Sequence, residues 1–246
     1  MTLPSPKDAL HRSQLYRLLI AIADDTRLAK SLVFKGGTCA VMQNYIDRFS
    51  VDLDFDLKQE TSKDFIQNEL EKIFRKLKFE IKSKNNSVVQ YALKYPAPKE
   101  MRNTLKFDAI GFALDCSISK PTYLADIDRY FNCQTIETMF AHKLVAILDR
   151  HEKHEAVAGR DVYDIYSFFI NGYSYNQDVI LERTSLGVLE YLKKVKEFIE
   201  LKISSSIIDE DLNMLMSFAQ FKTIRKSLKT EVLGMLKGEI ERLSHD

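Results

Sequence analysis

Apolar side chains recur every three or four residues along much of this chain. That spacing places them on one helix face and predicts helices over residues 9–32, 62–77, 136–149, 161–170, 178–202 and 208–243, the last of them interrupted. A shorter helix is predicted over 39–46, with Thr38 as its capping residue after the pair Gly36-Gly37. No strand pattern returns after residue 176.

Other segments alternate between apolar and polar residues or form short apolar runs, as β-strands do. They cover residues 31–34, 50–57, 78–82, 88–95 and 104–112. Weaker strand character is present at 113–118, and the rest of 111–127 is expected to be irregular. Because strands and helices mix only in the first part of the chain, we predict an α/β domain over 1–133 and a helical bundle domain over 134–246.

The strand predicted at 50–57 carries an acidic residue at every second position. Asp52, Asp54 and Asp56 would share one face of the strand, with apolar residues on the other. Carboxylates this close repel one another, and a hard cation such as Mg²⁺ (or Mn²⁺) would relieve that repulsion. The alternative is a solvated edge strand whose charges prevent aggregation. We predict that Asp52 and Asp54 bind metal, whereas Asp56 lies too far along the strand to contribute.

A site that transfers a phosphoryl group with two metal ions needs a further carboxylate from a neighbouring strand. Asp108 lies in the strand predicted at 104–112 and is the best candidate. Asp115 is the reserve candidate. The sequence therefore predicts a metal site formed by Asp52, Asp54 and Asp108.

The segment Gly36-Gly37-Thr38 precedes the acidic strand by one short helix. A glycine pair before a helix is common turn chemistry, and the Walker pattern GxxxxGK[ST] is absent. Beside the acidic strand, however, exposed backbone N–H groups, the helix dipole and one hydroxyl donor would form a phosphate cradle. Together the two features predict a metal–phosphate site.

Composition says more about the cellular compartment and the possible partners than about the reaction. The 246 residues include 36 basic and 35 acidic side chains, so the net charge of +1 neither demands nor excludes a nucleic-acid partner. Cys39, Cys116 and Cys133 form no CxxC pair, which favours a reducing compartment without a zinc site. No signal-peptide core or membrane-length apolar run is present, so a cytoplasmic protein without a membrane partner is expected.

The second half of the chain adds charged candidates. Lys143 lies among apolar residues and could neutralise triphosphate charge, although such a lysine is more often on a solvent face. Asp161 and Asp164 share a helix face, and Asp161 also suits the positive end of the helix dipole. A basic helix face is read as solvated, with RNA docking as the alternative; it comprises Lys222, Arg225, Lys226 and Lys229.

Five motifs in order over residues 15–172 resemble the AbiEii/AbiGii-type toxin nucleotidyltransferases of the polymerase-β-like nucleotidyltransferase superfamily. The motifs are Lys35-Gly36-Gly37-Thr38, Arg48-Phe-Ser50-x-Asp52-Leu-Asp54-Phe, Lys106-Phe-Asp108, the helix of Lys143, and Arg160-Asp161-x-x-Asp164. The resemblance implies an α/β nucleotidyltransferase core with a mixed sheet, followed by helices.

The resemblance also implies an activity. Asp52, Asp54 and Asp108 would bind Mg²⁺ (or Mn²⁺), and Asp161 or Asp164 would complete the catalytic set. An NTP would be held by residues Lys35, Gly36, Gly37, Thr38, Arg48, Ser50 and Lys143. The expected reaction transfers NMP to a macromolecular acceptor, tRNA first and protein second, and an antitoxin would restrain it. The alternatives are a catalytically degenerate RNA- or protein-binding module and a small-molecule nucleotidyltransferase.

Overall fold

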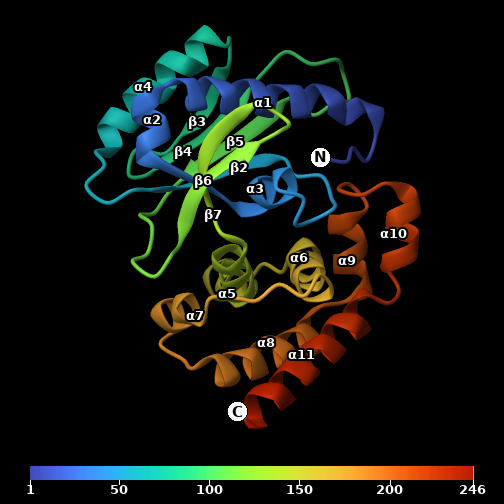
Figure 1. Ribbon diagram of the computed structural model, residues 1–246. Helices are drawn as coiled ribbons and strands as arrows, with labels where there is room; N and C mark the ends of the chain where they lie inside the picture. The colour runs from blue at the N-terminus through green and yellow to red at the C-terminus, as the bar shows by residue number, and fades with distance from the viewer. Residues whose placement is uncertain (246) are drawn as a thin grey trace. The chain divides into compact units, whose positions relative to one another are not determined.

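The computed structural model describes residues 1–245 and divides into two compact units (Figure 1). Unit 1 comprises Met1–Asn44 and Arg48–Thr135, and unit 2 comprises Tyr45–Asp47 and the chain from Ile136 onward. A seven-stranded sheet forms the centre of unit 1, whereas the described part of unit 2 consists of helices and their connections. The expected α/β fold with a mixed sheet and a helical C-terminal region is confirmed.

The sheet of unit 1 has the strand order β3-β4-β5-β2-β1-β7-β6. In chain order the elements are η1 (Pro6–Asp8), α1 (Ala9–Asp24), α2 (Thr26–Ser31), β1 (Leu32–Lys35), α3 (Gly36–Met42), β2 (Asp52–Leu57), α4 (Lys63–Lys76), β3 (Glu80–Lys84), β4 (Val89–Lys94), β5 (Thr104–Ala109), β6 (Ser119–Leu124) and β7 (Arg129–Gln134). β2–β5 and β1–β7 are parallel pairs, and the others are antiparallel. The acidic strand β2 therefore lies inside the sheet, not at its edge.

Aromatic side chains form the core on one face of this sheet. Phe55 of β2 stacks on Phe107 of β5 with ring centroids 5.0 Å apart, and it also contacts Phe34 of β1 at 5.1 Å. Phe74 of α4 packs against Phe107. Because neighbouring residues of a strand point to opposite faces, this packing directs Asp52 and Asp54 to the other face. The hydrophobic pattern thus fixes which way the carboxylates point.

Two boundaries near the N-terminus differ from the sequence prediction. The helix expected over 9–32 is broken at Asp25, whose extended backbone and side chain cap α2 through the N–H groups of Arg27 and Leu28. The helix expected over 39–46 begins at Gly36, so Thr38 lies inside α3 and is not its cap. Apolar periodicity continues across Asp25 and hides the break there. The glycine pair is interpreted as a turn before the helix, whereas it forms the first turn of α3.

β6 and β7 correct the prediction for the end of unit 1. No strand forms at 113–118 in the described chain, and β6 and β7 form an antiparallel hairpin over 119–134. β6 is short of apolar residues and contains Pro121. β7 becomes a strand because β1 pairs with one of its sides and β6 with the other. Long-range pairing of this kind leaves little local signal.

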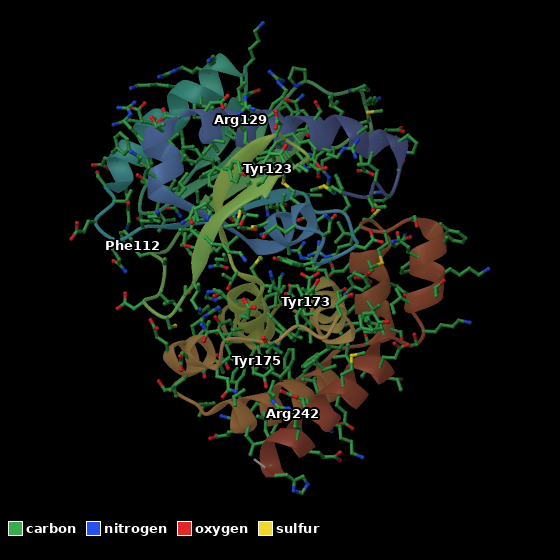
Figure 2. The ribbon with its side chains drawn as sticks, in the orientation of Figure 1. Phe112, Tyr123, Arg129, Tyr173, Tyr175 and Arg242 are labelled. Atoms are coloured by element: carbon green, nitrogen blue, oxygen red, sulfur yellow. The ribbon has the colours of Figure 1, made fainter. Side chains whose placement is uncertain are left out.

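The outer strand β6 is protected by its composition. Pro121 lacks a backbone N–H and is suited to an edge position. Tyr123 and Tyr130 form an exposed aromatic pair across the hairpin, with ring centroids 5.3 Å apart. Arg129, which Figure 2 labels together with Tyr123, forms an ion pair with Asp24 of α1 at 2.6 Å. The hairpin therefore closes one end of the sheet.

Unit 2 contains seven described helices. They are α5 (Ile136–His154), α6 (Gly159–Ile170), α7 (Gln177–Thr184), α8 (Val188–Lys202), α9 (Ser205–Leu212), α10 (Phe218–Ile224) and α11 (Leu228–His245). α5 packs against α6, α7 and α8, and α11 packs against α6 and α8. The helix predicted over 178–202 is split in two, and that over 208–243 in three. α5 extends beyond the predicted end at residue 149.

Candidate functional site

The carboxylates of β2 and β5 lie on the same face of neighbouring strands. In the parallel register, Asp54 is the partner of Asp108 and Asp52 is the partner of Lys106. Residues opposite each other in a sheet direct their side chains to the same side. The structure therefore brings together Asp52, Asp54 and Asp108, as the sequence predicts, while the reserve candidate Asp115 is exposed in the loop after β5.

Asp108 is in an unusual environment. Burial raises the pKa of its carboxyl group and the negative charge of Asp52 adds to the effect, while a hydrogen bond from Gln90 opposes both. Within residues 1–245, its Oδ1 is one of three buried side-chain oxygen or nitrogen atoms that have no hydrogen-bond partner. Such an atom costs about 1–3 kcal/mol unless a partner satisfies it. Asp108 thus has the chemistry to accept a cation or a proton.

The glycine turn lies directly against Asp54. Gly36 has a φ of +75°, and a Cβ at this position would be 2.5 Å from Asp54 Oδ2. Both the left-handed backbone and the contact exclude larger residues. β1 pairs with β2 so that Lys35 is opposite Asp54. The turn and the acidic strand therefore form one site.

Gly37 and Thr38 connect the turn to the segment before β2. A Cβ on Gly37 would lie 2.9 Å from Arg48 Nη2 and 3.0 Å from Ser50 Oγ. The Thr38 hydroxyl lies 2.8 Å from Ser50 Oγ and also contacts the backbone oxygen of Asp52. Arg48 is buried and donates to the carbonyl of Phe49 at 2.9 Å. The six predicted nucleotide-binding residues of this region thus all lie within unit 1. Thr38 links α3 to the first residue of β2.

His11 is a contributor that the sequence does not indicate. It is buried on α1, and its two ring nitrogens contact the Tyr95 hydroxyl at 2.6 Å and the Val51 carbonyl at 2.8 Å. Burial lowers the pKa of His11 to about 4. A neutral His11 therefore anchors the residue that precedes Asp52.

Unit 2 contains a separate group of ion pairs. Lys143 Nζ lies 2.9 Å from Asp161 Oδ1 and 2.8 Å from Asp164 Oδ2, and Arg150 Nε lies 3.2 Å from Asp161 Oδ2. Both carboxylates are fully buried. Burial would raise the pKa of Asp161, but the charges of Lys143, Arg150 and Arg160 outweigh it and lower the pKa to about 2. Lys143, Asp161 and Asp164 are thus brought together, and their role toward nucleotide stays a prediction.

Half of the basic helix face is used within unit 2. Lys229 Nζ donates to the carbonyls of Glu200 at 2.8 Å and Ile203 at 2.7 Å, which satisfies the end of α8. Arg225 forms an ion pair with Asp209. Lys222 and Lys226 are exposed. Arg225 is exposed as well, so the solvated interpretation fits three of the four residues, and Lys229 is the one that holds the end of a helix.

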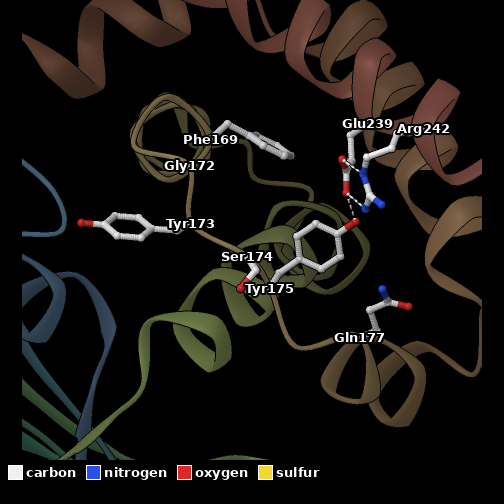
Figure 3. A pocket seen from close by; sticks show the side chains of 8 residues that line it. All are labelled: Phe169, Gly172, Tyr173, Ser174, Tyr175, Gln177, Glu239 and Arg242. Atoms are coloured by element: carbon white, nitrogen blue, oxygen red, sulfur yellow. Dashed lines mark hydrogen bonds and ion pairs between the residues drawn. The ribbon is translucent and has the colours of Figure 1, made fainter.

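Unit 2 also contains a cavity of about 320 Å³ that the sequence does not predict (Figure 3). Tyr175 donates to Glu239 Oε1 at 2.5 Å, and Arg242 Nη2 lies 2.9 Å from the same oxygen. The cavity is lined by Phe169, Gly172, Tyr173, Ser174, Tyr175, Gln177, Glu239 and Arg242. The Tyr175–Glu239–Arg242 network joins the segment before α7 to α11 and forms part of the cavity wall.

The carboxylates of the acidic cluster differ from a preformed metal site. Among residues 1–245, no three histidine, cysteine, aspartate or glutamate side chains already form a group that could hold a metal ion. The buried, unsatisfied Oδ1 of Asp108 beside Asp52 and Asp54 nevertheless fits a cation chemically, because Mg²⁺ binds carboxylate oxygens and retains water ligands. The donor set thus suits Mg²⁺ or Mn²⁺.

The acidic strand and the Gly36-Gly37 turn lie together on a mixed sheet, the arrangement that the resemblance to nucleotidyltransferases implies. The family model described as "Nucleotidyl transferase AbiEii toxin, Type IV TA system" matches residues 17–231. The chain belongs to this family of toxin nucleotidyltransferases. Membership implies an NTP substrate and an antitoxin partner.

Solved structures show the same fold. Crystal structures of JHP933 and of a putative nucleotidyltransferase, both from Helicobacter pylori, have 19% and 20% identity and TM-scores of 0.57 and 0.60. They align over 99% and 97% of this chain and 97% and 98% of theirs. MenT4, a nucleotidyltransferase toxin from Mycobacterium tuberculosis H37Rv, has 16% identity and a TM-score of 0.51 over 96% of this chain and 87% of its own. No curated protein matches the chain. Residues 1–245 contain no helix that is long and apolar enough to span a membrane.

Proposed function

We propose that this toxin nucleotidyltransferase transfers NMP from an NTP to a hydroxyl group of a macromolecular acceptor, tRNA first, in a reaction that depends on Mg²⁺. The observation that supports it is the cluster of Asp52, Asp54 and Asp108, which faces the Gly36-Gly37 turn within unit 1. In this reaction the acceptor oxygen attacks the α-phosphorus, the bond to the β-phosphate bridging oxygen breaks, and pyrophosphate leaves.

Each part of the cluster has a defined task in this proposal. Asp52, Asp54 and Asp108 would hold Mg²⁺ (or Mn²⁺), which when bound neutralises triphosphate charge and lowers the pKa of the attacking hydroxyl. Asp108 either supports a second ion or accepts the hydroxyl proton, because burial makes it a stronger base than an exposed aspartate.

The phosphates would be bound by the glycine turn. Absence of a side chain at Gly36 and Gly37 lets the backbone approach a β- or γ-phosphate closely. Thr38 and Ser50 keep this turn against β2, while Arg48 packs against Gly37. Lys143 is proposed to contact the nucleotide, and Asp161 or Asp164 to complete the catalytic set, on the basis of the matched motifs.

The test is transfer of label from each of four α-³²P-labelled NTPs in the presence of Mg²⁺ and total tRNA or lysate. Labelled RNA that disappears with Asp54→Asn supports the proposal, and label on a small molecule would identify the acceptor class instead. Asp115→Asn is the matched control because this residue is exposed. Failure of all four nucleotides to label any acceptor in an Asp54-dependent manner would overturn it.

A further inference from the structure

The third aspartate of β2 lies in different surroundings from the other two. Asp56 is only 4% exposed, whereas Asp52 and Asp54 are intermediate. Its Oδ2 accepts a hydrogen bond from Gln134 Nε2 at 2.8 Å, and its Oδ1 forms an ion pair with Lys35. Gln134 is itself buried at the end of β7. Side chains from β1 and β7 thus fix this carboxylate.

Lys35 in turn lies next to the proposed metal ligands. It is the register partner of Asp54, and it directly precedes Gly36, which contacts the Asp54 carboxylate. Burial raises the pKa of Asp108, and the charge of Lys35 partly opposes that effect. The Lys35 side chain is 31% exposed. The ammonium group therefore acts on the same carboxylates that a divalent cation would bind.

This proximity creates a competition. A lysine ammonium is a compact charge on a flexible four-carbon stem and pairs readily with carboxylates. If it moved onto Asp54 or Asp108, a divalent cation would have to displace it. The ion pair with Asp56 gives Lys35 a buried partner of its own.

We propose that Asp56 is a positioning residue that, with Gln134, holds Lys35 to one side of the Asp52–Asp54–Asp108 cluster and leaves these carboxylates to a divalent cation. The inference rests on the proposed function of the cluster as a metal site. It gives the third acidic residue of the strand a task that differs from metal binding.

A double-mutant cycle on metal affinity tests the proposal without nucleotide or turnover. Mn²⁺ is titrated into the full-length protein, and the unbound ion is measured by electron paramagnetic resonance. Asp56→Asn keeps an acceptor for Gln134 but loses the charge that holds Lys35. It is expected to weaken Mn²⁺ binding about tenfold in the wild-type background and less than twofold in a Lys35→Gln background.

A second variant separates positioning from long-range charge. Gln134→Leu changes no charge, yet it loosens Asp56 and is expected to weaken Mn²⁺ binding about threefold, again only where Lys35 is present. Thermal melts of every variant identify any that fail to fold, and Gln134→Leu then carries the test. An equal effect of Asp56→Asn in both backgrounds, or no effect of either variant, would overturn the inference.

The proposed function is tested by a different arm of the same experiment. Asp54→Asn should abolish Mn²⁺ binding by the otherwise unaltered protein. Wild-type protein that binds no Mn²⁺ in an Asp54-dependent way contradicts the metal site and with it this inference. Asp54-dependent binding that is indifferent to Asp56 and Gln134 contradicts the inference alone.

Discussion

Asp54 and Asp108 are direct partners across the parallel strands β2 and β5, although a helix and two strands separate them in sequence. Their pairing puts two carboxylates side by side on a rigid part of the sheet, and one of them keeps a buried oxygen without a hydrogen bond. Burying such an oxygen is unfavourable unless it has a partner, and a bound ligand would supply that partner.

Replacement of Asp108 tests that arrangement. Asp108→Asn removes one negative charge from the cluster, so we expect nucleotidyl transfer to fall at least about 100-fold, as is typical for the loss of a group that stabilises charge in the transition state. The free energy of unfolding should stay the same or increase, since like-charge repulsion is reduced. Label transfer and urea unfolding measure the two effects. Equal activity losses for Asp108→Asn and the control Asp115→Asn would contradict the assignment.

Gly36→Ala should disturb the site through the backbone. The left-handed conformation alone costs a non-glycine residue about 1–2 kcal/mol, and the new methyl group would meet Asp54 Oδ2 at 2.5 Å. We therefore expect lower stability together with weaker Mn²⁺ binding. Gly111→Ala is the matched control, since a Cβ there has no neighbour within 4 Å. A Gly36→Ala protein with unchanged Mn²⁺ affinity would show that the contact does not matter.

His11 should make stability depend on pH. Its folded-state pKa is about 4, below the ordinary value of 6.5, because burial disfavours the charged ring. Below pH 6.5 the unfolded chain therefore binds a proton at His11 that the folded chain does not bind. Neutral His11 contributes about 3 kcal/mol to the free energy of unfolding above pH 6.5, and this contribution is lost as the pH falls toward 4. Urea unfolding between pH 4 and 7.5 should show a steeper loss for wild type than for His11→Gln. Parallel curves for the two proteins would contradict the prediction.

Lys143→Met should destabilise unit 2. The substitution leaves Asp161 and Asp164 buried with less compensating charge, for which about 3–5 kcal/mol is typical. Lys143→Arg keeps the charge and should lose less. Lys194→Met is the control, because its ion pair with Glu190 is on the surface. Unfolding curves measure all three, and a fully stable Lys143→Met protein would sink this account of the cluster.

Side-chain alternation sufficed to predict the acidic strand and the face that its carboxylates share. It also indicated Asp108, because β5 alternates in the same way. The burial of Asp56 could not be predicted, since it depends on Gln134 from a strand whose sequence has no clear strand pattern. His11 was equally invisible, because its partners Tyr95 and Val51 come from distant segments.

Periodicity also fails where a single side chain decides the local structure. Asp25 interrupts the predicted helix because its side chain caps the start of α2, within an apolar periodicity that continues past it. Threonine is a common helix cap, yet the Thr38 hydroxyl forms hydrogen bonds to Ser50 Oγ and to the backbone oxygen of Asp52 in β2. Both residue types are typical of helix caps, but the sequence does not indicate which groups their side chains contact.

The place of β7 in the sheet has a consequence for how the protein is made. β1 is flanked by β2 and by β7, and β7 is the last strand of unit 1 along the chain. A ribosome must therefore release the chain through Gln134 before β1 has both neighbours and before Asp56 has its amide donor. Shorter nascent chains carry every acidic residue of β2 and β5 but lack this support, so the sheet around the acidic strand is completed only at the end of synthesis of unit 1.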